Sequence, residues 1–332
     1  MRLALLPFLL LAVVLVALSV GRYPLAPSDI LGFLGACLGL VDLPPERFDL
    51  LRNLIVEIRL PRVLAAGLIG AALSASGASF QAVFRNPLVS PGILGVLGGA
   101  GFGAALGILL SGDILTVQIS AFAMGLVAVG VGVLIANLFG AASMVTLVLG
   151  GMISGALFAS ALSLVKYAAD PYDQLPAIVY WMMGSLGAVD LKQLKAAAPA
   201  ILLGVGALTL AGRALDALSM GDDEARSLGV PVHLTRYGVI AMATLVSSLS
   251  VSLAGMIGWV GLVVPHVARL AIGPTNSRLL PASALLGASF LIAADSVARN
   301  ITRAEIPIGI VTELLGIPVF MLVLGRARRA WA

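Results

Sequence analysis

The chain has 332 residues, of which 60% are apolar and only 11% are Asp, Glu, Lys or Arg. A soluble domain carries about 25% charged residues, so this composition excludes a set of soluble domains. The formal net charge of +4 is too small and too dispersed to indicate a nucleic-acid partner, and a mean hydropathy of +1.09 is typical of a polytopic membrane protein.

Metal-binding and nucleotide-binding patterns are scarce. The chain has one cysteine, Cys37, and two histidines, His233 and His266. We therefore expect no disulfide within the chain, no metal site and no bare transition-metal cargo held by these side chains. None of the three lysines follows the glycine pattern of a phosphate-binding loop, so the chain is not expected to hydrolyse nucleotide by that route.

Charge-free stretches predict an all-α membrane protein. Backbone in hydrocarbon must pair its own polar groups, which only helices and closed barrels achieve. The sequence lacks the period-two alternation of barrel strands, so we expect helices of about 20 apolar residues. We predict ten spans, at residues 3–21, 63–84, 86–112, two within 114–165, 194–211, 237–254, 257–272, 279–294 and 306–324. The stretch 114–165 is too long for one helix, and Asn137-Leu138-Phe139-Gly140 is the expected break. The first apolar stretch, residues 3–21, could instead be a cleaved signal peptide. It is longer than the apolar core of a usual signal peptide, which favours a retained helix.

The distribution of basic residues leaves the orientation open. Ten spans place both termini on one side, and the tail with Arg326, Arg328 and Arg329 favours the cytoplasm. With that topology, however, Lys and Arg divide equally between the two sides. Either the topology is wrong or the outer surface keeps its arginines for a purpose.

The second span is predicted to open with Arg59-Leu-Pro-Arg62. Proline suits a first helical turn, and arginines three residues apart should share one face, here towards the outer water. Positive charge is unfavourable at a helix N-terminus, so a compensating group is expected. Anchoring to lipid phosphate and docking of carboxylates on an acidic partner both remain open.

The segment Arg85-Asn86-Pro87-Leu88 predicts a tight turn at the inner surface, because its proline and the Pro-Gly that follows end one helix and restart another. Asn86 can cap a helix there, and Leu88 can plug a path. From spacing alone, a plain turn is favoured over a gate.

The longest polar inner loop, residues 213–236, is predicted to fold as two short helices, which we call the inner knob. Asp216 is expected to start the first helix, Gly221 to break it, and Asp222 to cap the second, with acidic residues at its positive end. Gly229 and the proline after it should stop that helix. Such a capped structure favours a partner-binding element over a loose connector.

Three glycines, Gly255, Gly258 and Gly261, are expected to form a smooth helical face before Pro265. Near the outer end of the ninth span, Asp295 and Arg299 are spaced to pair within one helix. Glu313 lies inside the last apolar run, where an ionisable group is costly and is by default a candidate site.

Four passages together resemble the membrane permeases of type II ABC importers for iron chelates (siderophores, haem) and cobalamin: residues 59–77, 85–95, 258–266 and 294–309. The resemblance covers about residues 10–325. It implies one transmembrane permease domain over 1–332, ten helices, and a homodimer with the pathway on its two-fold axis. It also implies two cytoplasmic ABC ATPase subunits, a periplasmic or lipid-anchored substrate-binding protein, and a bacterial or archaeal cell membrane with both termini cytoplasmic. ATP and Mg²⁺ would belong to the partner ATPase, and this chain would bind no cofactor and be no enzyme.

The resemblance also implies roles for individual residues. Docking of the binding protein would fall to Arg59, Arg62 and Arg299, which would explain the excess of outer basic residues. The cytoplasmic gate would comprise Asn86, Leu88, Ser143 and Met144. The ATPase-coupling residues would be Ala217, Leu218, Gly221, Asp222, Glu224, Ala225, Leu228 and Gly229.

Two departures from the cobalamin pattern leave the cargo open. Residues 166–176 lengthen an outer segment, and Glu313 stands where a small residue is usual. Molybdate or tungstate import on the same architecture is an alternative, although an acid in the pathway would not favour a free oxyanion. An ion-coupled secondary transporter, with Glu313 or Asp295 carrying the proton, is the alternative from another class.

Overall fold

The computed structural model describes residues 3–138 and 143–331 and, over these ranges, consists of helices joined by turns. After a 3-10 turn at Leu3–Leu5, the helices are α1 Leu6–Ser19, α2 Pro27–Cys37, α3 Pro45–Arg52, a π-helical segment Asn53–Arg59, α4 Leu60–Val83, α5 Val96–Leu110, α6 Ile114–Leu138, α7 Met144–Ala168, α8 Gln174–Met182, α9 Leu191–Leu210, α10 Gly212–Met220, α11 Asp222–Ser227, α12 Val232–Ala254, α13 Val260–Ile272, α14 Asn276–Asn300 and α15 Ile308–Trp331.

The all-α prediction with about ten spans is confirmed. Six helical stretches in the described residues are long and apolar enough to cross a membrane, and four shorter apolar helices coincide with the other predicted spans. The long stretch 114–165 forms α6 and α7, as expected. Of its predicted break, Asn137 and Leu138 are the last residues of α6, whereas residues 139 and 140 lie outside the described part of the chain.

The predicted start of the second span is wrong, because the helix begins much earlier. Residues 45–83 form one continuous helical stretch that passes through the π-helical segment into α4. Proline lacks an N–H and its ring crowds the preceding turn. The wider π-helical turns directly before Pro61 accommodate it inside the stretch, and the N–H of Leu60 bonds five residues back to Ile55.

The predicted start of the third span, at residue 86, is also wrong. Residues 84–95 form turns, and α5 begins only at Val96. Pro87 and Pro91 withhold two backbone donors, and Gly95 has a φ of +90°, which favours glycine. The connection is therefore an extended turn rather than a helix.

The expected smooth helical face of Gly255, Gly258 and Gly261 is wrong as well. Helix α12 ends at Ala254, Gly255 has a φ of +72°, and the backbone stays non-helical until Val260. A Cβ at Gly255 would overlap the carbonyl oxygen of Trp181, so this glycine permits a close backbone approach in a loop.

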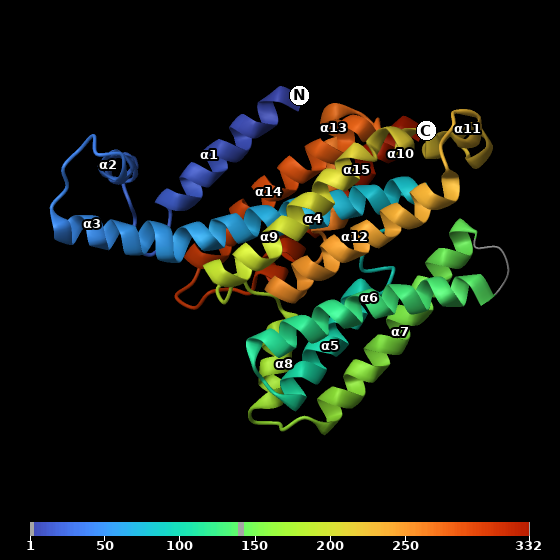
Figure 1. Ribbon diagram of the computed structural model, residues 1–332, viewed down its shortest axis with the longest axis horizontal. Helices are drawn as coiled ribbons and strands as arrows, with labels where there is room; N and C mark the ends of the chain where they lie inside the picture. The colour runs from blue at the N-terminus through green and yellow to red at the C-terminus, as the bar shows by residue number, and fades with distance from the viewer. Residues whose placement is uncertain (1–2, 139–142, 332) are drawn as a thin grey trace.

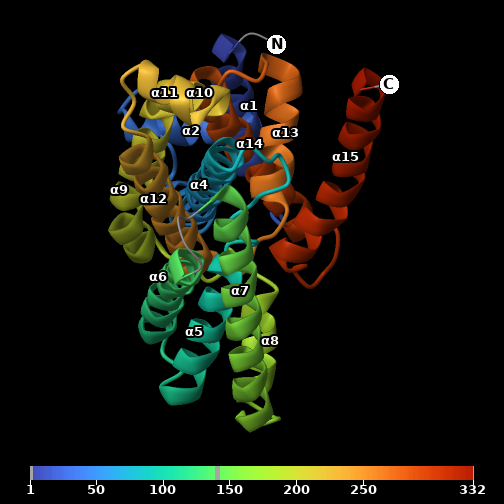
Figure 2. The same cartoon turned by 90° about the vertical axis from the view of Figure 1, so that its right-hand side faces the viewer.

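Helices α4 and α14 form the centre of the molecule. Most of α4 is buried, and it crosses α14 where a Cβ on Gly70 would overlap the carbonyl oxygen of Gly287. Small residues allow such backbone contact, which replaces the hydrophobic driving force that lipid cannot provide. Figure 2 shows α4 enclosed by its neighbours, while α15 stands apart from α5–α8.

The long axis has two different ends (Figure 1). Helices α2 and α3 occupy one end, and α10 and α11 occupy the other. Helix α1 runs from the N-terminus towards the α2–α3 end, whereas α15 runs towards the α10–α11 end. The first residues of α1 and the last residues of α15 therefore lie towards the α10–α11 end, which fits an even number of spans. We refer to the α2–α3 end as outer and to the α10–α11 end as inner.

Candidate functional site

A buried carboxylate organises the outer ends of α4 and α14. Asp295 is 1% exposed and accepts hydrogen bonds from Nε of Arg62 at 2.9 and 3.1 Å. Arg299 lies one turn further along α14, with its Nε 3.0 Å from Oδ2 of Asp295. Arg62 also donates from Nη1 to Glu305 at 2.8 Å. Two arginines from different helices thus share one buried acid, and we call these four residues the outer arginine cluster.

The cluster supplies the counter-charge that two largely buried arginines require, although Arg62 lies inside a continuous helical stretch and not at a helix N-terminus. Arg62 and Arg299 have side-chain exposures of 13% and 10%, so only small parts of each guanidinium reach the outer surface. The predicted pair of Asp295 and Arg299 is present, but it is shared with Arg62 rather than self-contained. Glu305 was missed, because no periodicity marks an acid in the loop between α14 and α15.

Arg59 does not face the outer water, so the expected common face with Arg62 is wrong. It is 4% exposed, and its guanidinium donates to the carbonyl oxygens of Leu18, Ser19 and Tyr23. The last carbonyls of a helix have no partner within the helix, and a cation satisfies both their hydrogen bonds and their partial charge. Arg59 therefore caps the end of α1. Its role in docking a partner stays a prediction.

The inner turn after α4 is fixed by a few local bonds. Arg85 has a φ of +48°, a conformation that non-glycine residues rarely adopt. The N–H of Asn86 bonds to the carbonyl of Gln81 at 3.1 Å, and Oδ1 of Asn86 accepts from the N–H of Leu88 at 2.9 Å. Asn86 thus shapes the turn itself rather than capping a following helix, and Leu88 is left 50% exposed at its tip.

The other two predicted gate residues begin α7. Ser143 caps this helix, accepting from the N–H of Thr146 at 3.1 Å. Met144 packs into the same apolar cluster as Phe84 and Val89, which flank the turn of Asn86 and Leu88. The structure thus brings the two predicted parts of the gate to one apolar cluster. The gating function stays a prediction.

The inner knob contains the two predicted short helices, α10 and α11, separated by Gly221, but two caps were assigned wrongly. Helix α10 starts at Gly212, so Asp216 lies within it, and its carboxylate accepts from the N–H of Asn276 at 2.5 Å and of Ser277 at 3.2 Å. Asp216 therefore caps α14. Asp222 is the first residue of α11, and its carboxylate turns away to arginines.

The carboxylate of Asp222 forms ion pairs with two arginines from different elements. Arg236 of α12 donates from Nη2 to its two oxygens at 2.8 and 2.7 Å, and Arg85 donates from Nη2 to Oδ1 at 2.5 Å. The hydrogen bonds from Arg236 are the largest cause that lowers the pKa of Asp222 below its ordinary value. The sequence reading missed both arginines as partners.

The inner knob has a buried and an exposed side. Ala217, Leu218 and Ala225 are buried against the membrane helices, whereas Met220 and Leu228 are 68% and 62% exposed. The acids Asp223 and Glu224 are exposed on α11. Apolar residues thus fix the buried side of the inner knob, while its exposed side presents apolar and acidic groups.

Glu313 is exposed on α15, in a run of apolar residues that includes Leu314 and Leu315. Its Oε1 lies 3.6 Å from the position that a Cβ on Gly258 would occupy, and within the described part of the chain it has no ion-pair partner. By contrast, His266 is tied by Nδ1 to the carbonyl of Leu262 at 2.8 Å, which fits a structural role.

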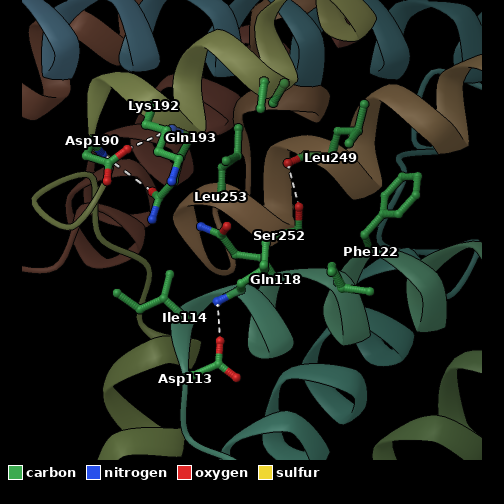
Figure 3. Close-up of a pocket in the computed structure, with 14 residues that line it drawn as sticks. Asp113, Ile114, Gln118, Phe122, Asp190, Lys192, Gln193, Leu249, Ser252 and Leu253 are labelled. Atoms are coloured by element: carbon green, nitrogen blue, oxygen red, sulfur yellow. Dashed lines mark hydrogen bonds between the residues drawn. The ribbon is translucent and has the colours of Figure 1, made fainter.

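A cavity of about 560 Å³ opens between α6, α9 and α12 (Figure 3). Asp113 and Asp190 lie at its polar end, but both are helix caps that bond the N–H groups of Thr116 and Gln193 at 3.1 and 2.7 Å. The hydrogen bond from Ser111 is the largest cause that lowers the pKa of Asp113 to about 2. Both carboxylates are engaged as caps and most of the remaining lining is apolar, so the cavity is a groove between helices.

The FecCD transport family matches residues 9–326. The chain is 35% identical to the molybdate import system permease protein MolB of Haemophilus influenzae, over 98% of this chain and 95% of the relative. It is 42% identical to the vitamin B12 import system permease protein BtuC of Escherichia coli, over 82% and 84%. A solved structure, described as an inward-facing ABC transporter assigned to the metal-chelate type, superposes with a TM-score of 0.86 at 34% identity, covering 98% of both chains.

Proposed function

The chain belongs to the FecCD transport family and is a permease subunit of an ABC importer in the bacterial inner membrane, and from this premise we propose that it moves a metal chelate, either an iron chelate (siderophore or haem) or cobalamin. The permease chain itself is a transport component and not an enzyme, and we propose that it binds no cofactor, with ATP and Mg²⁺ held by partner ATPase subunits. The secondary-transporter alternative has no support from the family.

The observation that carries the choice of cargo is Glu313. Its carboxylate is exposed on α15 and has no counter-charge in the described residues. A fixed negative charge in a low-dielectric pathway repels a free oxyanion, whereas a bulky chelate with a buried metal is affected less. Molybdate is the second candidate, because the molybdate permease of Haemophilus influenzae matches nearly the whole chain.

We propose the following assembly. Two copies of this chain form a single transmembrane unit around a central pathway, with both termini cytoplasmic. A substrate-binding protein docks at the outer arginine cluster, mainly on Arg62 and Arg299, while Arg59 acts through α1. The turn of Asn86 and Leu88, with Ser143 and Met144, closes the inner end. The exposed side of the inner knob receives an ATPase subunit, whose closure drives alternating access.

A transport assay tests the cargo. The permease, its ATPase and its binding protein are reconstituted in liposomes, and uptake of a radiolabelled ferric siderophore, haem, cobalamin and molybdate is measured with and without ATP. We expect ATP-dependent uptake of one chelate and none of molybdate. Glu313→Gln should alter uptake while leaving the thermal unfolding of the complex unchanged.

Molybdate uptake above that of every chelate would overturn the proposed cargo but not the importer function. Solute accumulation driven by a pH gradient, with no ATPase present, would instead overturn the importer function. A Glu313→Gln variant with wild-type uptake of all four solutes would leave Glu313 without a part in the choice.

A further inference from the structure

Arg85 joins two parts of the protein to which separate tasks are assigned. Its backbone begins the gate turn directly after α4, and its side chain reaches the inner knob. There Nη2 binds Oδ1 of Asp222 at 2.5 Å, and Nε donates to the carbonyl oxygen of Leu218 at 2.8 Å. The guanidinium therefore holds both short helices of the knob, α10 through Leu218 and α11 through Asp222.

The same residue is held firmly on the side of the gate. A left-handed backbone conformation is strained at a residue with a Cβ, so the surrounding bonds must maintain it at Arg85. The N–H of Arg85 bonds to the carbonyl of Ala82 at 3.3 Å, and that of Asn86 bonds to Gln81 at 3.1 Å. A displacement of the guanidinium is thus passed to the turn that carries Leu88.

Arg236 fixes the other side of Asp222. Its side chain is 6% exposed at the start of α12 and binds both carboxylate oxygens, whereas Arg85 and Asp222 are 37% and 33% exposed. The carboxylate is therefore anchored to α12 and linked to the gate turn. An ion pair exposed to this extent adds little to folding stability. The contact can therefore be removed without unfolding the protein.

We propose that Arg85 is the positioning residue that transmits movement of the inner knob to the cytoplasmic gate, through its contacts with Asp222 and Leu218. This inference rests on the proposed function, because it assumes that the ATPase moves the knob and that the turn of Asn86 and Leu88 is the gate. The inference adds to the proposed function the side chain through which the inner knob acts on the gate turn.

The first experiment measures coupling in the reconstituted transporter complex. Arg85→Gln removes the charge and the fork of donors, and Arg85→Lys keeps only the charge. We expect both variants to retain ATPase association and ATP hydrolysis. Uptake per ATP hydrolysed should fall about two- to thirtyfold in Arg85→Gln and less in Arg85→Lys. Arg278→Gln is the matched control, because it removes an exposed inner arginine that has no ion pair within the described residues.

A double-mutant cycle with Asp222→Asn tests the contact itself. If Arg85 acts through Asp222, adding Arg85→Gln to Asp222→Asn should lower uptake per ATP by much less than it does in the wild type. Fully additive losses would show that the two side chains act separately and would overturn the proposal.

A distance measurement gives a readout that stability alone would not change. Spin labels are placed at Ser227→Cys on the knob and Leu88→Cys in the turn, in a Cys37→Ser background. In a complex in which only one of the two copies carries the labels, we expect one narrow distance distribution, retained when the complex is trapped with nucleotide, and a broadened one in Arg85→Gln. Identical distributions, together with normal uptake per ATP in Arg85→Gln, would overturn the inference. Failure of the wild-type knob to bind an ATPase would instead overturn the proposed function.

Discussion

Asp295 is the counter-charge for two arginines that are almost withdrawn from water. A buried ion pair gains little over a well-packed apolar pair, but the loss of one partner leaves an uncompensated buried charge. In the outer arginine cluster, a single carboxylate serves two cations, so its removal affects α4 and α14 together.

We therefore predict that Asp295→Asn destabilises the protein by about 3–5 kcal/mol. Thermal unfolding in detergent, followed by circular dichroism, measures the effect. Asp29→Asn is the matched control: Asp29 also pairs with an arginine, Arg47, but this pair is 27% and 37% exposed and should contribute little to stability. Equal shifts in the two variants would contradict the prediction.

Arg59 leads to a second prediction at this scale. Arg59→Met should leave the carbonyls of Leu18 and Tyr23 without their donor, whereas that of Ser19 keeps the N–H of Leu25, and the unpaired buried carbonyl of Leu18 should cost about 1–3 kcal/mol. The unfolding midpoint should fall, and protease sensitivity should rise at the end of α1. Arg52→Met, at an exposed position of the same helical stretch, should change neither. An unchanged midpoint in Arg59→Met would contradict the role as a cap.

The sequence predicts the partner of an arginine only where both residues lie on one helix. The pair of Asp295 and Arg299 follows from helical spacing, because residues four apart share a face. The contacts of Arg62 with Asp295 and of Arg85 with Asp222 join residues 233 and 137 positions apart. Such contacts depend on which helices are neighbours, and local periodicity carries no information about that.

At the scale of elements, α11 is held by an acid whose pKa is lowered in the folded protein. A group of this kind stabilises the fold above its unfolded pKa, about 4, and the contribution is lost as pH falls through the lower, folded pKa. The contribution of Asp222 is thus fully present at neutral pH and disappears only in acid.

We predict that α11 loosens below about pH 4, before the membrane helices unfold. Fluorescence anisotropy of a probe on Ser227→Cys, in a Cys37→Ser background, should be constant from pH 8 to about pH 5 and then fall. Asp222→Asn should give a lower anisotropy with a weaker acid transition. A wild-type transition centred above pH 5 would show that another group is responsible.

The crossing of α4 and α14 makes a prediction about helix packing. Gly70→Ala would place a methyl group on the carbonyl of Gly287, and overpacking of this kind costs about 1–3 kcal/mol. Gly130→Ala is the matched control, because Gly130 lies exposed within α6 with nothing within 4 Å of its added Cβ. Unfolding in detergent should distinguish them, and a Gly70→Ala variant as stable as Gly130→Ala would refute the contact.

The helices themselves were predictable, because hydrocarbon requires long apolar segments and leaves few alternatives. The residues at which the helices begin and end were harder to predict. Pro61 was read as a helix start, but the π-helical segment lets the helix continue through it, and Gly255 was read as helical although its φ is +72°. In both places, contacts with neighbouring elements decide the backbone conformation.

At the scale of the whole molecule, the native cysteine reports the orientation. Cys37 is the only cysteine of the chain, is exposed, and ends α2 at the outer end, opposite the inner knob. We predict that a membrane-impermeant maleimide labels Cys37 in intact spheroplasts. In a Cys37→Ser, Ser227→Cys variant, labelling should require permeabilised membranes. The reverse pattern would invert the topology and place both termini outside.

The pairing of α4 with α14 has a consequence for the energetics of transport. Helix α14 is joined to α4 near the outer surface by Asp295 and Arg62, and to α10 of the inner knob near the other surface by Asp216, which caps it. A ligand that favours one arrangement of the pair from outside must change the affinity of a ligand bound inside, and the reverse change has the same factor. A delivery protein that tightens ATPase association tenfold would thus itself be retained tenfold more tightly, and its release becomes a thermodynamic cost that each nucleotide cycle has to meet.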